Sequence, residues 1–192
     1  EPLPILLMVI DTMRHVRDRK LEIANPLVWT YAVGGAFYHL LGAGLWGFAH
    51  TLPQINYYTH GSQVTVSHGH LAFFGAYAML NLMVFYYAMP KLKGLKSYAQ
   101  GRGKFGFWTM VSAMFCLGLA FGVAGILQAY LERVLGFGYM ATQEQMRFWF
   151  MVAFFCGLGF LVGVLVTVYD LFFPKPKEEG VRIEGAGAEV AA

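Results

Sequence analysis

The chain contains few charged residues and few cysteines, and both shortages narrow the class of protein. Lys, Arg, Asp and Glu make up 13% of its 192 residues, whereas soluble domains average about 25%. The two cysteines, Cys116 and Cys156, each lie inside an apolar run, where we expect small buried hydrophobes. There is no Cys-x-x-Cys-His motif and no cysteine cluster, which argues against a covalently attached haem and against a cysteine-rich metal site. The net charge of +3 without a basic stripe argues against a nucleic-acid partner.

Apolar residues dominate instead, at 57% of the chain, and aromatic residues make up 17%. They predict an all-α, polytopic transmembrane helix bundle, because about 20 consecutive apolar residues span a bilayer. We expect a partial span at about 1–13 and full spans at about 27–50, 64–89, 104–134 and 143–173. The chain starts within the partial span, without an initiator Met or a signal peptide. We therefore expect a fragment, or one piece of a split or cleaved larger protein.

Basic residues alternate between the connections, which predicts the orientation in the membrane. The connection after the first span is basic and includes His15, and the one near residues 91–102 is also basic. Residues 51–63 carry no Lys, Arg, Asp or Glu. By the positive-inside rule, the basic connections and the tail are cytoplasmic. Residues 174–192 are rich in Pro, Gly and charge, and we expect a disordered cytoplasmic tail.

Glycines mark the expected helix contacts. Gly118 and Gly122 form one small-xxx-small pair, and Gly159 and Gly163 form another. The span at 27–50 contains five more: Gly34, Gly35, Gly42, Gly44 and Gly47. Small residues let helix backbones approach closely in lipid, so we expect these positions to face neighbouring helices.

His68-Gly69-His70 is the candidate functional element. Histidine within a membrane span is costly without a partner and is a functional-site candidate. Residues i and i+2 of a helix point about 200° apart, so one helix offers an imidazole on each of two faces. Two separate cofactors fit this arrangement better than one metal ion does. The alternative is that both imidazoles form hydrogen bonds to neighbouring helices.

The residues that follow each histidine along its face differ in size. Ala72, Gly75 and Met79 follow His68 and leave room for a flat group, whereas the residues on the His70 side are mostly aromatic: Phe73, Phe74, Tyr77 and Asn81. Haem, with a histidine Nε2 as its axial ligand, fits a tight helical bundle of this kind.

Four other polar residues are weaker candidates. His50, Thr51 and His60 lie beside or within the uncharged connection at 51–63. They are candidates for residues that contact the cofactor ligands without contacting the cofactor itself. Glu1 carries a carboxyl group within the partial span, where it could carry protons or balance the charge of a metal centre. It could equally be an ordinary interfacial glutamate. We expect His39 to be a satisfied core histidine.

Several motifs together resemble the catalytic subunit of bacterial nitric oxide reductases, in the haem–copper oxidase superfamily. The resemblance runs from Glu1 to about Phe173. It rests on four motifs: GAGLWGF at 42–48, NYYTHG at 56–61, SHGHLAFFGAYAM at 67–79 and YAMP at 87–90. It corresponds to the C-terminal spans of a subunit with about twelve or more helices.

This resemblance implies a role for three residues. His68 would be the proximal ligand of a high-spin haem b3, His70 one axial ligand of a low-spin haem b, and Glu1 a proton-handling glutamate. Electrons would pass from haem b to a haem b3–non-haem iron centre that reduces two NO to N2O and water. The family's non-haem iron ligands lie upstream of the matching segment.

The resemblance also implies partners and a location. The N-terminal part of the catalytic subunit, or a second chain, would supply the iron ligands. A cytochrome c subunit or quinol would donate electrons, and the helices would contact lipid in the bacterial inner membrane, with the haem end towards the periplasm. The alternatives are a quinol-dependent form, an NO dismutase, a non-catalytic membrane b-type cytochrome and a structural protein.

Overall fold

A computed structural model of the chain describes residues 2–18, 25–95 and 99–176. Within these ranges the chain forms helices joined by short turns, without a β-strand, so the predicted all-α fold is confirmed. The fold begins with α1 (Pro2–Asp18) and a continuous helical segment made of α2 (Pro26–His39), η1 (Leu40–Trp46) and α3 (Gly47–Thr51). The short helix α4 (Pro53–Thr59) follows.

The second half contains the longest helices. A continuous segment is made of α5 (Gln63–Phe73), η2 (Phe74–Met79) and α6 (Leu80–Leu92), and the next of α7 (Gly101–Ala129) and η3 (Tyr130–Val134). The last helix is α8 (Tyr139–Phe172). The three η elements are π-helical stretches, in which the backbone bonds reach one residue further than in an α-helix.

Local sequence explains where the helices start. Asn25 caps α2 by accepting a hydrogen bond from the backbone N–H of Leu27 at 3.1 Å, and Pro26 occupies the first helical position. Ser62 caps α5 in the same way, through the N–H of Val64. Gly61 adopts a positive φ of 73°, which permits the tight turn between α4 and α5.

Three helical segments of the described chain are long and apolar enough to cross a membrane: Gln63–Leu92, Gly101–Val134 and Tyr139–Phe172. They correspond to the predicted spans at 64–89, 104–134 and 143–173. The predicted span at 27–50 is helical throughout, but its mean hydropathy is too low for it to count among these membrane-crossing segments. Its glycines, tyrosines and His39 lower its hydropathy.

Two local predictions were wrong. The first helix runs to Asp18, so Arg14, His15 and Arg17 lie on α1 and not in the following connection. His15 stays in the helix and its Nδ1 lies 2.9 Å from the carbonyl oxygen of Asp11, one turn back. The connection at 51–63 is also partly helical, because Pro53 starts α4.

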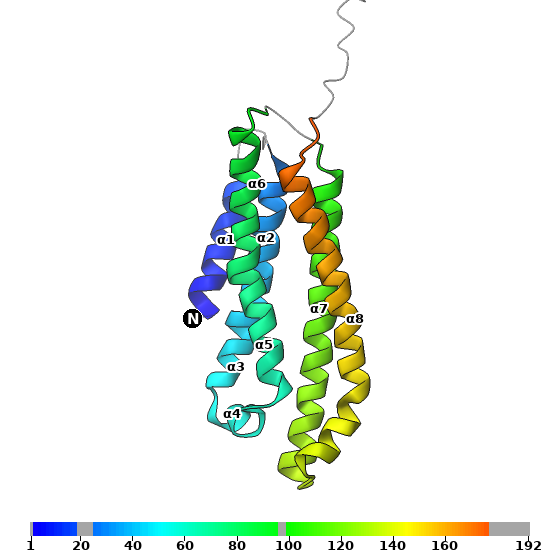
Figure 1. Cartoon of the computed structure of the whole chain (residues 1–192). Helices are drawn as coiled ribbons and strands as arrows, with labels where there is room; N and C mark the ends of the chain where they lie inside the picture. Colours follow the sequence, from blue (N-terminus) through cyan, green and yellow to red (C-terminus); the bar gives the residue numbers. More distant parts are fainter. Residues whose placement is uncertain (1, 19–24, 96–98, 177–192) are drawn as a thin grey trace, which may run out of the picture.

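The helices run lengthwise, side by side (Figure 1). The ends of α1, α6 and α8 and the start of α7 lie at one end of the bundle, whereas α3, α4 and the α7–α8 turn lie at the other (Figure 1). The first end carries Arg14, Arg17, Lys91, Lys93 and Arg102, so the structure groups the basic segments as the charge pattern predicts. Which end faces the cytoplasm remains a prediction.

Helix backbones approach closely at two glycines, of which Gly42 was predicted as a helix contact and Gly75 was not. A Cβ on Gly42 would collide with the backbone of Leu71 and Ala72, and one on Gly75 with the backbone of Tyr38 and His39. These two glycines therefore set the distance between the α2–η1 segment and the α5–η2 segment.

The two small-xxx-small pairs face neighbouring helices, as predicted. Gly118 packs against Leu71, and Gly163 packs against Met110. The cysteine prediction fails for Cys116, which is exposed on the surface of α7, whereas Cys156 is half-buried. Both are free thiols.

A buried ion pair connects α7 and α8 at the basic end of the bundle. Asp170 of α8 is 0% exposed, and its Oδ1 accepts a hydrogen bond from Nε of Arg102 at 3.0 Å. The Tyr86 hydroxyl donates to the other carboxylate oxygen at 3.3 Å. Arg102 also donates to the carbonyl oxygen of Phe173, so it joins the start of α7 to the end of α8.

Candidate functional site

The imidazole of His68 is held from the side of η1. Its Nδ1 lies 2.9 Å from the carbonyl oxygen of Gly42. A carbonyl oxygen can only accept a hydrogen bond, so Nδ1 carries the proton and Nε2 keeps its lone pair. Gly47 lies beside the same ring, since a Cβ there would be 3.2 Å from Cε1 of His68. The ring is half-buried and its orientation is fixed.

The imidazole of His70 is held by its own helix. Its Nδ1 lies 2.9 Å from the carbonyl oxygen of Val66, one turn earlier in α5. The same argument assigns the proton to Nδ1 and the lone pair to Nε2. The ring packs against Phe121 of α7, with ring centroids 5.3 Å apart. His70 is exposed, in contrast to His68.

The two histidines line two different hollows. The hollow at His68 has a volume of about 630 Å³ and is walled by α2, η1, α3, α5 and η2. The hollow at His70 has a volume of about 660 Å³ and is walled by α5, η2, α6, α7 and α8. Both volumes fall in the range of about 300–1,000 Å³ that is usual for ligand pockets. The two imidazoles therefore border two hollows, which adjoin along Gly69, Phe73 and Tyr77.

The neighbours predicted for His70 all line its hollow: Phe73, Phe74, Tyr77 and Asn81. Those predicted for His68 agree only in part. Ala72 lines the His68 hollow, whereas Gly75 packs against α2 and Met79 lies buried beside Gly35. The reason is that the face holding Gly75 and Met79 is the face that α2 covers, so the room below His68 is provided by Ala72 and Ala76.

Of the three residues predicted to support the cofactor ligands, two lie near His68 and one does not. The ring of His50 packs on the ring of His68, with centroids 5.2 Å apart and planes tilted by 47°. Thr51 lines the His68 hollow, and its hydroxyl donates to the carbonyl oxygen of Phe48 at 2.7 Å. His60 is exposed at the end of α4 and lines neither hollow. The structure thus brings His50 and Thr51, but not His60, to His68.

Two other candidates have different outcomes. Glu1 lies outside the described residues, so its prediction is not tested. His39 was expected in the core, but it is half-buried and lines the His68 hollow, because α2 ends on that side. Among the described residues, no group of three or more His, Cys, Asp or Glu side chains is arranged to hold a metal ion.

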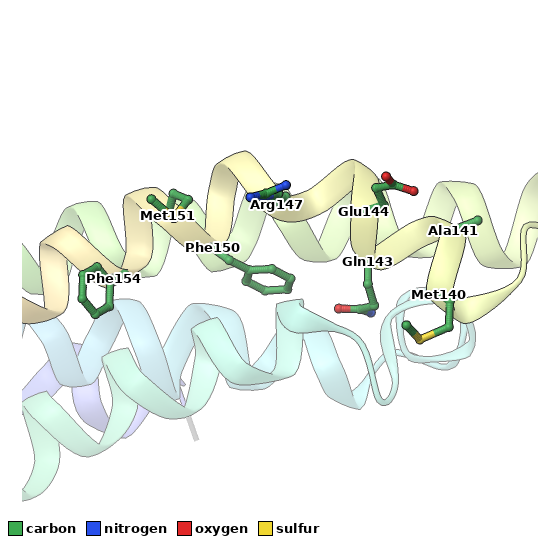
Figure 2. Close-up of a pocket in the computed structure, with 8 residues that line it drawn as sticks. All are labelled: Met140, Ala141, Gln143, Glu144, Arg147, Phe150, Met151 and Phe154. Atoms are coloured by element: carbon green, nitrogen blue, oxygen red, sulfur yellow. The ribbon is translucent and has the colours of Figure 1, made fainter.

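Another hollow, of about 840 Å³, lies on an open face of α8. Figure 2 shows Glu144 and Arg147 on one side of this helix and Met140, Gln143 and Phe150 on the other. All its lining residues belong to one helix, and none is a histidine. It therefore lacks the converging polar groups expected of a functional site.

The geometry at His68 and His70 fits an axial ligand of haem iron. Histidines that bind metals almost always donate their other ring N–H to a carboxylate, a carbonyl or water. Here both Nδ1–H groups donate to carbonyl oxygens, so both Nε2 atoms are available as ligands. Each imidazole borders a hollow of suitable size whose other walls are mostly apolar. The chemistry that this arrangement permits is the binding of two flat metal cofactors, one on each side of α5.

Sequence reasoning missed the carbonyl groups that orient the ligands, those of Gly42 and Val66. The Val66 carbonyl could have been found, because it lies one turn before His70. The Gly42 carbonyl could not, because its position depends on helix packing. The buried Asp170 was also missed, although a carboxylate inside an apolar helix indicates a special environment.

Comparison with known proteins gives matches over most of the chain. Residues 1–159 match the family described as cytochrome c and quinol oxidase polypeptide I. A nitric oxide reductase subunit of Stutzerimonas stutzeri is 41% identical over 178 residues, which cover 88% of this chain and 38% of that protein. The cytochrome c oxidase subunit 1 homolog of Azorhizobium caulinodans is 25% identical over 174 residues, which cover 87% of this chain and 31% of that protein.

The chain therefore matches only about a third of the length of these two relatives. The family match covers most of the chain and includes His68 and His70. With three helices able to cross a membrane, the chain is a multi-pass membrane protein. It belongs to the cytochrome c and quinol oxidase polypeptide I family, within the haem–copper oxidase superfamily that the sequence motifs predict.

Proposed function

We propose that this chain is the haem-ligating C-terminal part of a membrane nitric oxide reductase. In this proposal His68 is the proximal ligand of a high-spin haem b3, and His70 is an axial ligand of a low-spin haem b. Two NO molecules take up two electrons and two protons and give one N2O and one water. The 41% identity to a nitric oxide reductase subunit supports NO as the substrate over oxygen.

One observation carries the proposal. The two imidazoles of a single helix have the same hydrogen-bonding state and open into separate hollows. Histidines that only bridged helices would use their nitrogens on neighbouring side chains or backbones, with no space beside them. Here Nδ1 of each ring is used and the other side of each ring faces a hollow.

The residues of this chain would orient the cofactors. The Gly42 and Val66 carbonyls hold the proton on Nδ1 of His68 and His70, which raises the basicity of Nε2 as a ligand. Because both ligands lie on α5, their separation is fixed by one rigid helix. The haems would supply electron transfer and NO binding.

The rest of the active site would come from outside this chain. A non-haem iron and the second axial ligand of haem b require residues of an N-terminal part of the subunit or of a second chain. Glu1 would handle protons near that centre. We propose that a cytochrome c subunit or quinol donates the electrons, and that the complex works in denitrification in the bacterial inner membrane with its haem end towards the periplasm.

An absorption spectrum of the purified membrane complex, with assays of N2O production, tests the proposal. We expect two b-type haems, one low-spin and one high-spin, and a change in the high-spin bands when NO is added. Two low-spin haems without NO turnover would instead identify a non-catalytic cytochrome. The absence of a Soret band would rule out both functions.

Two related activities are the alternatives within the family. An NO dismutase would give N2 and O2 from NO without consuming donor electrons, so its products distinguish it. The similarity to a cytochrome c oxidase subunit 1 homolog raises oxygen reduction as a second candidate. Oxygen consumption with reduced cytochrome c, at a rate that exceeds NO turnover, would favour it. A quinol-dependent reductase would use quinol in place of cytochrome c.

A further inference from the structure

The His68 ring contacts three residues of one short helical segment that also forms part of the wall of its hollow. The Gly42 carbonyl accepts its Nδ1–H, Gly47 lies against its Cε1 edge, and His50 packs on its ring. These three residues belong to η1 and α3, which form a continuous helix. Gly42 therefore sets the tautomer, whereas Gly47 and His50 restrict how the ring can rotate.

The π-helical geometry of η1 explains how Gly42 reaches His68. The N–H of Gly47 bonds to the Gly42 carbonyl, five residues back, and the same carbonyl accepts the His68 proton. A carbonyl oxygen has two lone pairs and can accept both bonds. Because a Cβ on Gly42 would collide with α5, the carbonyl is fixed close to the ring.

The contact with His50 is one of ring packing. Both ring nitrogens of His50 are shielded from solvent, and neither has a hydrogen-bond partner among the described residues. Its ring is tilted by 47° to the His68 ring at a centroid distance of 5.2 Å, which is in the range of packed aromatic pairs. An aromatic ring without nitrogens could therefore make the same contact.

We propose that Gly47 and His50 are positioning residues that set the orientation of the His68 imidazole and thereby tune the high-spin haem. Gly47 does so by lacking a side chain, and His50 by packing its tilted ring against the ring of His68. The inference rests on the proposed ligand role of His68. It adds two residues whose replacement should alter that haem and leave the one at His70 unchanged.

The test uses the complete membrane complex and the variants Gly47→Ala, His50→Ala and His50→Phe. The readout is the iron–histidine stretching band of the reduced high-spin haem in resonance Raman spectra, with the low-spin haem bands as an internal reference. We expect Gly47→Ala and His50→Ala to shift or broaden the iron–histidine band, and His50→Phe to restore the wild-type band. Gly157→Ala is the matched control, because no atom of the described residues lies within 4 Å of a Cβ placed there.

The outcomes separate this inference from the proposed function. An unchanged band in both Gly47→Ala and His50→Ala would overturn the positioning role while leaving His68 as a ligand. A His50→Phe variant that behaves like His50→Ala would overturn the packing argument. A wild-type complex without an iron–histidine band would contradict the ligand role of His68 itself, and with it the proposed function.

Discussion

His68 and His70 differ in their immediate surroundings, although both are proposed as haem ligands. Both are histidines in an apolar helix, yet one is half-buried against η1 and the other is exposed beside Phe121. The sequence was sufficient to predict that the imidazoles point to different sides, because that follows from helix geometry. It was insufficient to predict which carbonyl orients His68, because Gly42 is 26 residues away in the chain.

The buried Asp170–Arg102 pair allows a prediction at single residues. Asp170 is 0% exposed, so Arg102→Met would leave a carboxylate buried without its cation. Breaking a buried pair in this way costs about 3–5 kcal/mol. We expect a loss of this size in the free energy of unfolding, measured by SDS titration of the detergent-solubilised protein with tryptophan fluorescence as the signal.

The exposed pair Arg17–Asp18 is the control for this prediction. Its side chains are 77% and 63% exposed, and exposed pairs contribute little to stability. We expect Arg17→Met to unfold at the wild-type SDS fraction. If Arg102→Met and Arg17→Met lowered the free energy of unfolding equally, the burial of Asp170 would not explain the contribution of its ion pair to stability.

At the scale of the helices, apolar runs predicted most of the architecture. The three long spans match because long apolar segments have few alternatives in lipid. The π-helical stretches were not predicted, since they arise where packing against a neighbour shifts the backbone bonds and leave no periodic pattern. Helix α1 runs to Asp18, beyond the span predicted at about 1–13, because exposed basic residues are good helix formers and can extend a helix past an apolar segment.

The contact between the α2–η1 and α5–η2 segments gives a prediction at this scale. Gly75→Ala would place a Cβ into the backbone of Tyr38 and His39. Overpacking typically costs about 1–3 kcal/mol, and here backbone must move. We expect a lower SDS midpoint and loss of the haem at His68, measured on the purified complex from unfolding curves and haem spectra.

Gly157→Ala on α8 provides the comparison. Space is open at that position, so no contact is lost. We expect an unchanged or slightly higher midpoint, because alanine favours helix over glycine by roughly 0.5–1 kcal/mol. A Gly75→Ala variant as stable as Gly157→Ala would contradict the close approach of the two segments.

At the scale of the whole molecule, the chain carries the two proposed haem ligands, but the hollows beside them are open. His70, Phe73 and Tyr77 are exposed, although they line hollows. The relatives that match this chain are more than twice as long. The resemblance of the sequence to a longer family predicts that other helices complete the site. That the hollows at His68 and His70 are open could not be predicted from the sequence, because it depends on how the helices pack.

The separation of charge between the two ends predicts how the molecule sits in the membrane. Tyr57 on α4 and Leu92 at the end of α6 lie at opposite ends and are 74% and 80% exposed. In a background of Cys116→Ser and Cys156→Ser, a membrane-impermeant maleimide should label Tyr57→Cys in intact cells. It should label Leu92→Cys only after permeabilisation. The reverse pattern would invert the predicted orientation.

The central claim is that one helix carries the ligands of two different haems, and spectra of His68→Ala and His70→Ala in the complete complex test it most directly. We predict that His70→Ala removes the low-spin haem bands and blocks electron entry. His68→Ala should retain those bands, lose the high-spin haem and abolish NO turnover. Full haem content and activity in both variants would contradict the assignment of His68 and His70 as haem ligands.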